Sequence, residues 1–92
     1  EDIVRELDCI VDNGAKVLNV IVEHKIYGQL VGDLLIRSRA DVRRFMQRVE
    51  EYGTRPLTDL TEGVHFHTIE AEQEETLDAV EQALEEEGFL LR

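Results

Sequence analysis

The sequence predicts an α+β domain in which helices cover one face of an antiparallel sheet. Segments with the apolar spacing of a buried helical stripe alternate with segments rich in β-branched residues, which indicates both helices and strands. Two of the predicted strands are joined by only a few residues, as in an antiparallel hairpin. A chain of 92 residues with 42% apolar side chains can form one small core. The predicted order is helix, strand, strand, helix, strand, helix and a short last strand.

The first helix is predicted over residues 2–13. Its apolar residues follow the i, i+3, i+4, i+7 spacing of one buried stripe, formed by Ile3, Val4, Leu7, Ile10 and Val11. Asn13-Gly14 supplies the stop, because glycine adopts the left-handed conformation that ends many helices. Glu6 falls at the edge of the stripe, where its carboxylate either reaches around the boundary of the core or stays in solvent.

The hairpin is predicted from strands at residues 16–24 and 28–37. Strict alternation in the first strand places apolar residues on both faces, Leu18, Val20 and Val22 on one and Val17 and Ile21 on the other. We therefore expect this strand to be central and covered on both sides. In the second strand, one face carries Leu30, Gly32, Leu34 and Ile36, and the opposite face carries Val31 and Leu35.

A second helix is predicted from Ser38 to Gly53. Ser38 and Asp41 have the S-x-x-D spacing of a capping box, and the apolar stripe consists of Val42, Phe45, Met46 and Val49. Pro56 prevents the helix from continuing and begins a linker to a strand over residues 63–71.

A third helix is predicted over residues 73–87, with Leu77, Val80 and Leu84 buried. Gly88 ends it, and we expect Phe89 to fold back onto Leu84. Residues 89–91 then form a short strand or an apolar tail. A strand before Glu1 would complete a βαββαβ, ferredoxin-like arrangement, and we expect one upstream because the chain does not begin with Met.

The composition excludes several classes of function. The net charge of −11 repels phosphate backbones, so this chain alone is not expected to bind DNA or RNA. No apolar run approaches the roughly 20 residues that span a membrane. Cys9 is the only cysteine, which precludes an internal disulfide and is in keeping with a cytoplasmic protein.

The sequence offers one candidate site for chemistry, His65-x-His67. Alternation along a strand puts both imidazoles on one face, where they either bind a metal ion together or are polar residues on the open side of a sheet. Imidazole nitrogens favour zinc, nickel, cobalt or iron over magnesium or calcium. His24 and Tyr27 lie at the turn of the hairpin. His24 is either a structural surface residue or a ligand contact, and Tyr27 either a turn residue or part of a pocket.

Three motifs together resemble the three-histidine (3H) domain of niacin-responsive bacterial transcriptional repressors. They are Ile10-Val11-Asp12-x-Gly14, His24-x-x-Tyr27-Gly28, and Pro56-Leu57-x-x-Leu60-Thr61-x-Gly63-x-His65-x-His67-Thr68. The resemblance runs from about Leu7 to Gly88. One departure is Lys25, where the family pattern has proline after the histidine.

The resemblance implies that residues 1–92 are a single effector-binding and metal-binding domain, the C-terminal part of a longer regulator. It implies a divalent transition metal, nickel or zinc, held by Glu6, His65 and His67, with a further histidine upstream of this chain. It also implies nicotinic acid or a related pyridine carboxylate as corepressor, a homodimer, and contact with DNA only through an N-terminal winged-helix domain.

The favoured hypothesis is therefore the ligand-sensing domain of a niacin-responsive repressor, without membrane contact and without enzymatic activity. A second hypothesis is a small metal-dependent hydrolase that uses the same histidines, with Glu62 or Glu70 as the base. A third is a dimerisation or amino-acid-sensing module that binds no metal.

Overall fold

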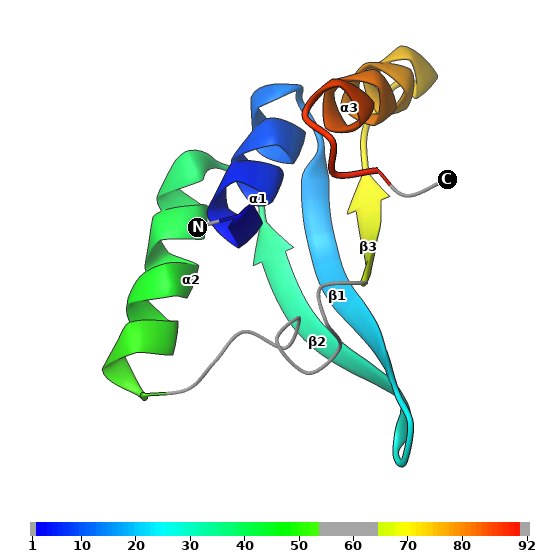
Figure 1. Ribbon diagram of the computed structural model, residues 1–92. Helices are drawn as coiled ribbons and strands as arrows, with labels where there is room; N and C mark the ends of the chain where they lie inside the picture. The colour runs from blue at the N-terminus through cyan, green and yellow to red at the C-terminus, as the bar shows by residue number, and fades with distance from the viewer. Residues whose placement is uncertain (1, 54–64, 91–92) are drawn as a thin grey trace.

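The computed structural model describes residues 2–53 and 65–90, and it confirms the α+β class (Figure 1). The elements are α1 (Asp2–Asp12), β1 (Lys16–His24), β2 (Gly28–Ile36), α2 (Arg39–Glu51), β3 (Phe66–Glu70) and α3 (Glu74–Glu86). Their order matches the prediction through the third helix. Phe89 and Leu90 follow α3 without forming a strand, which agrees with the apolar-tail alternative. The predicted linker at Pro56, and the first two positions of the predicted strand at 63–71, lie outside the described residues.

The sheet is antiparallel, with strand order β2-β1-β3, so β1 is central as predicted. The strand order differs in one respect from a ferredoxin-like sheet. In that arrangement the strand before the first helix separates the last strand from the hairpin, whereas here β3 pairs with β1 itself. The helices lie on one face of the sheet (Figure 1). The other face leaves Val31, Leu35 and Phe66 more than half exposed, so the expectation that β1 is covered on both sides is wrong for the described residues.

A β-bulge in β1 changes which residues face the helices. The pairing of β1 shifts between Val17 and Asn19 against both of its neighbours. Leu18 therefore breaks the strict alternation on which the predicted faces depend. Val17, Val20 and Val22 are all buried, so the predicted placement of Val17 on the opposite face is wrong. In β2 the predicted alternation is confirmed, with Ile36 buried and Val31 and Leu35 exposed.

Local signals at the helix ends act as predicted. The N–H groups of Gly14 and Ala15 donate to the carbonyls of Val11 and Ile10, and Gly14 has a φ of 98°. The same pattern recurs after α3, where the Phe89 N–H donates to the Leu84 carbonyl at 2.9 Å. Both helices thus end in Schellman motifs.

The capping box predicted for α2 forms with one change of partner. The Asp41 N–H donates to the Ser38 hydroxyl, as expected for an N-cap. The Asp41 carboxylate accepts from the N–H of Arg37, one residue before the N-cap, instead of from Ser38. The first turn of α2 is therefore fixed from both sides of the N-cap.

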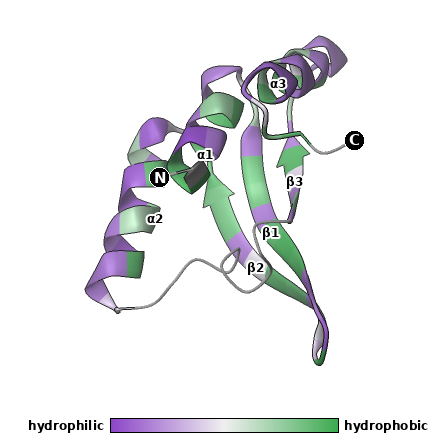
Figure 2. Ribbon diagram, viewed as in Figure 1, coloured by the Kyte–Doolittle hydropathy of each residue, from purple (hydrophilic) through white to green (hydrophobic). Residues whose placement is uncertain are grey.

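The core lies between the sheet and the three helices, and all six elements contribute residues to it or pack against it. Figure 2 shows apolar segments in these elements. The fully buried residues of the core are at most 2% exposed. They are Leu7, Ile10, Ala15, Val17, Ile36, Val42 and Val80. The predicted stripe of α1 is confirmed in full, because Ile3, Val4 and Val11 pack against this cluster. Leu77 of α3 is 37% exposed, so its predicted burial is wrong. The helix turns Val80 and Leu84 inward and leaves Leu77 at the edge of the stripe.

Among the helices of the described residues, none is long and apolar enough to cross a membrane.

Candidate metal centre

Glu6 is a buried carboxylate on the inward side of α1. It lies four residues before Ile10, which is fully buried, so the two side chains share the side of the helix that faces the core. Only 8% of the residue is exposed, and it is the one buried charged residue in the part of the chain that the structure describes. A carboxylate in this position requires partners that stabilise its charge.

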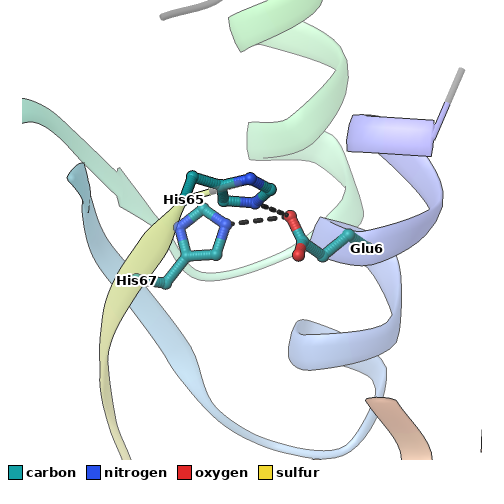
Figure 3. A group of neighbouring side chains, drawn as sticks. All are labelled: Glu6, His65 and His67. Atoms are coloured by element: carbon teal, nitrogen blue, oxygen red, sulfur yellow. Dashed lines mark hydrogen bonds and ion pairs between the residues drawn. The ribbon is translucent and has the colours of Figure 1, made fainter. Parts of the chain in front are cut away.

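Two imidazoles from the sheet supply those partners. His65 precedes β3 and His67 lies within it, and both side chains point at Glu6 (Figure 3). The Nε2 atoms of His65 and His67 lie 2.7 Å and 2.9 Å from the same oxygen, Glu6 Oε1. The two rings meet edge to face, with their centroids 4.8 Å apart. The shared face that the H-x-H spacing predicts thus brings both histidines onto one carboxylate oxygen.

The ionisation of Glu6 reflects two opposing influences. Burial raises its pKa, whereas hydrogen bonds and positive charge from His65 and His67 lower it. The combined effect of the two imidazoles is larger than that of burial, and the pKa of Glu6 falls to about 2. Glu6 is therefore an anion at neutral pH, which is the form that can bind a cation.

His67 is oriented from behind by the main chain of β1. Its Nδ1 donates to the carbonyl oxygen of Asn19 at 2.9 Å. A carbonyl oxygen can only accept a hydrogen bond, so the proton is on Nδ1. The other ring nitrogen, Nε2, is then the atom presented to Glu6. This is the arrangement in which a second hydrogen bond sets the orientation of a metal-binding histidine.

The donor set suits a divalent transition metal. One ligand atom from each of Glu6, His65 and His67 can be chosen so that all three lie within 4.8 Å of one another. Two imidazole nitrogens and one carboxylate oxygen are ligands that zinc, nickel and related ions accept. Three protein ligands leave a position of a tetrahedral site for water or a small molecule.

The structure does not bring the other two predicted residues into this cluster. His24 and Tyr27 lie at the hairpin turn, with ring centroids 5.0 Å apart. His24 Nδ1 accepts hydrogen bonds from the N–H groups of Ile26 and Tyr27, which gives His24 a structural role in the turn. Tyr27 is 74% exposed. A role of either residue in ligand binding remains a prediction.

Sequence reasoning missed the contribution of Asn19. A main-chain carbonyl carries no residue-specific signal, and its direction depends on the bulge. The one available hint was that Asn19 interrupts a run of β-branched residues in which asparagine is unfavourable.

A hollow of about 520 Å³ lies on the outer side of α1. Its walls are polar and carry two ion pairs: Arg39 bonds to Asp12, and Arg5 approaches Glu87. None of the residues that line it belongs to the Glu6–His65–His67 cluster. The hollow therefore adds nothing to the candidate site.

The fold and this cluster define a small α+β domain with a candidate metal site between a helix and the edge of a sheet. The family model of the 3H domain matches residues 1–92, so the chain belongs to the 3H domain family, as its motifs indicated.

Two curated relatives cover nearly all of the chain. It is 43% identical over 91 residues to the probable transcription repressor NiaR of Thermotoga maritima, an alignment covering 99% of this chain and 52% of that protein. It is 39% identical over 87 residues to the transcription repressor NadR of Bacillus subtilis, covering 95% of this chain and 48% of that protein. The chain thus spans about half the length of these relatives.

Proposed function

We propose that this chain is the effector-sensing domain of a niacin-responsive transcriptional repressor. The observation that carries the proposal is the convergence of Glu6, His65 and His67 in a chain closely related to two repressors. Glu6, His65 and His67 would hold a nickel or zinc ion, which would offer an open coordination position to nicotinic acid or a related pyridine carboxylate.

His24 and Tyr27 are the proposed second contacts for this ligand. Val20 and Val22 of β1 face the helices, and His24 follows at the same alternation. His67 pairs with Val20, so His24 lies on the face of the sheet that also carries the imidazole of His67.

The partners follow from the same proposal. DNA would be contacted by a domain outside this chain, because a net charge of −11 opposes contact with phosphates. The working form would be a homodimer in the cytoplasm. The corepressor would regulate it only by binding one dimer geometry more tightly than another.

The hydrolase alternative loses one of its proposed bases. Glu70 is an exposed residue that lies near Lys16, and alternation along β3 puts it on the face opposite His67. It cannot reach a molecule bound at the two imidazoles. Glu62, the other proposed base, lies outside the described residues. We propose that the domain has no enzymatic activity.

Calorimetric titration with nicotinate, with and without zinc or nickel, tests the proposal. We expect nicotinate to bind only when metal is present, and His65→Ala to abolish metal binding. His24→Ala is the matched control, because His24 lies outside the metal cluster. His24→Ala should bind the metal as the wild type does and should weaken only the binding of nicotinate.

Other outcomes would favour the alternatives. Metal-dependent turnover of an ester or amide without nicotinate binding would favour a hydrolase. If the protein binds no metal, or if His65→Ala does not change its metal binding, the remaining hypothesis is a sensing or dimerisation module without metal at this site.

A further inference from the structure

We propose that Asn19 is a positioning residue for His67, which it holds with Nδ1 protonated and with Nε2 directed at the proposed metal site. The inference rests on the proposed metal-binding function, but it concerns a residue that touches neither Glu6 nor a bound ion. The side chain and the main chain of Asn19 act together.

The pairing of β1 with both of its neighbours is irregular. The register shifts between Val17 and Asn19 on the side of β3 and also on the side of β2. On the β2 side, Leu35 has a φ of 51°, which is rare for a residue other than glycine. A bulge turns the main-chain groups next to it out of the regular ladder. Asn19 is the residue at which pairing with β3 resumes, opposite Thr68.

Asn19 makes two hydrogen bonds to successive residues of β3. Its side-chain Oδ1 accepts from the Thr68 N–H at 3.1 Å. Its main-chain carbonyl accepts from Nδ1 of His67 at 2.9 Å. In a regular ladder, a main-chain N–H such as that of Thr68 would pair with a main-chain carbonyl of β1. The amide oxygen of Asn19 takes that donor instead, and this leaves the carbonyl free for the imidazole.

The second bond determines what His67 can offer to a metal. With Nδ1–H held on the Asn19 carbonyl, Nε2 is the ring nitrogen that faces Glu6 Oε1, at 2.9 Å. A metal ion would displace the proton of that contact and bind Nε2. The side chain of His67 is 8% exposed, so water does not readily replace the carbonyl as a partner. Rotation of the ring would leave the Asn19 carbonyl without this donor in a largely buried place.

The side chain of Asn19 is needed for this arrangement as well as its main chain. Alanine or valine at position 19 has no oxygen for the Thr68 N–H. That donor would then turn to the main-chain carbonyl of residue 19 and draw it toward the regular ladder, away from His67. Asparagine is otherwise depleted in strands, and here it interrupts the run from Val17 to Val22. By accepting from the Thr68 N–H, the Asn19 side chain therefore keeps the main-chain carbonyl directed at the imidazole of His67.

Three variants test the proposal. Asn19→Ala removes the side-chain acceptor, and Asn19→Asp keeps an oxygen at the same place as the conservative rescue. Asp33→Ala is the matched control, because Asp33 pairs with Asn19 from the β2 side, and β1 separates β2 from β3. All three substitutions remove or replace one polar side chain in the same row of the sheet.

Two measurements are made on each variant. The first is the Nδ1–H resonance of His67 in proton–nitrogen correlation spectra of the metal-free protein. We expect it to be protected from exchange in the wild type, Asn19→Asp and Asp33→Ala, and to be lost in Asn19→Ala. The second is a cobalt(II) titration followed by its absorption bands. Asn19→Ala should bind cobalt about tenfold or more weakly than the wild type, as for loss of other groups that orient ligands, whereas Asn19→Asp and Asp33→Ala should bind nearly as tightly as the wild type.

The outcomes separate this inference from the proposed function. If the wild type binds cobalt and Asn19→Ala binds it equally well with Nδ1–H still protected, Asn19 does not position His67, although the metal site stands. If Asp33→Ala weakens binding as much as Asn19→Ala, the effect belongs to the sheet in general and the inference is wrong. If the wild type binds no metal, the proposed function fails, and the Nδ1–H resonance still decides whether Asn19 orients the ring.

Discussion

A carboxylate on α1 is stable in its buried position because two imidazoles accompany it. Without partners, a charge with 8% exposure would be strongly disfavoured. His65 and His67 both converge on Oε1 of Glu6, so the three side chains stabilise one another even before any ligand is considered. The same atoms are the ones that would bind a metal, so protons and a metal ion compete for this cluster.

Acid should destabilise the metal-free protein through Glu6. The pKa of Glu6 is about 2 when folded, against 4.5 for the free side chain. A carboxyl whose pKa is lowered by folding contributes stability above its unfolded pKa and loses it as the pH falls toward its folded pKa. Between about pH 5 and pH 2, the free energy of unfolding should fall by up to about 3 kcal/mol on account of this group.

Urea unfolding at several pH values, with Glu6→Gln as the test variant, measures this contribution. The variant should lack that part of the pH dependence. Glu23→Gln is the control, because Glu23 is exposed on β1 and lies outside the Glu6–His65–His67 cluster. Equal slopes in all three proteins would contradict the assigned ionisation of Glu6.

At the scale of the element, local chemistry determines where α1 and α3 stop. Gly14 and Gly88 both adopt positive φ, 98° and 80°, and both close Schellman motifs. The two sites differ in their surroundings. A Cβ on Gly14 would lie 3.3 Å from Cγ2 of Thr76 on α3, whereas a Cβ on Gly88 would meet nothing within 4 Å.

Substitution by alanine should separate these two effects. Gly88→Ala should lower the free energy of unfolding by about 1 kcal/mol, the penalty for the left-handed conformation alone. Gly14→Ala should lower the free energy of unfolding by about 2 kcal/mol, because Thr76 must also move. Chemical denaturation measures both values. Thr76→Ser in the Gly14→Ala background should recover the difference, and a smaller effect at Gly14 than at Gly88 would contradict the close contact with α3.

The strands show where local pattern is insufficient. The limits of β1 follow from composition, and the observed range of Lys16–His24 is the predicted one. Composition does not predict which residues of β1 face the core, because the shift in pairing at Leu18 turns Val17 inward. A bulge arises from the pairing of one strand with its neighbours, which a single strand does not encode.

For the molecule as a whole, the candidate metal centre joins the first helix to the edge strand of the sheet. Glu6 and His65 are 59 residues apart in sequence, so an ion held by both would oppose unfolding of the entire domain. At a free metal concentration of about 100 times Kd, binding should add roughly 2.7 kcal/mol to the free energy of unfolding. For a domain of this size, Tm should rise by about 10–20 °C.

Thermal unfolding with zinc or nickel, followed by excess chelator, measures this linkage. The rise in Tm should disappear when the chelator is added and should be absent in His67→Ala. His24→Ala should retain it, since that residue lies at the hairpin turn. A rise of equal size in His67→Ala would place the bound metal elsewhere in the molecule.

The sequence by itself determined the order of the elements, the ends of the helices and the shared face of His65 and His67. Each of these depends on spacing or turn chemistry within a few residues, which a single chain displays directly. The family resemblance implied that Glu6 joins the two histidines, and the tertiary structure decided how its carboxylate meets both imidazoles. The tertiary structure alone decided that Val17 faces the core and that the Asn19 carbonyl holds His67. These depend on strand register and helix packing between residues up to 61 positions apart. No local pattern fixes such contacts, because they exist only once the sheet and α1 have packed together.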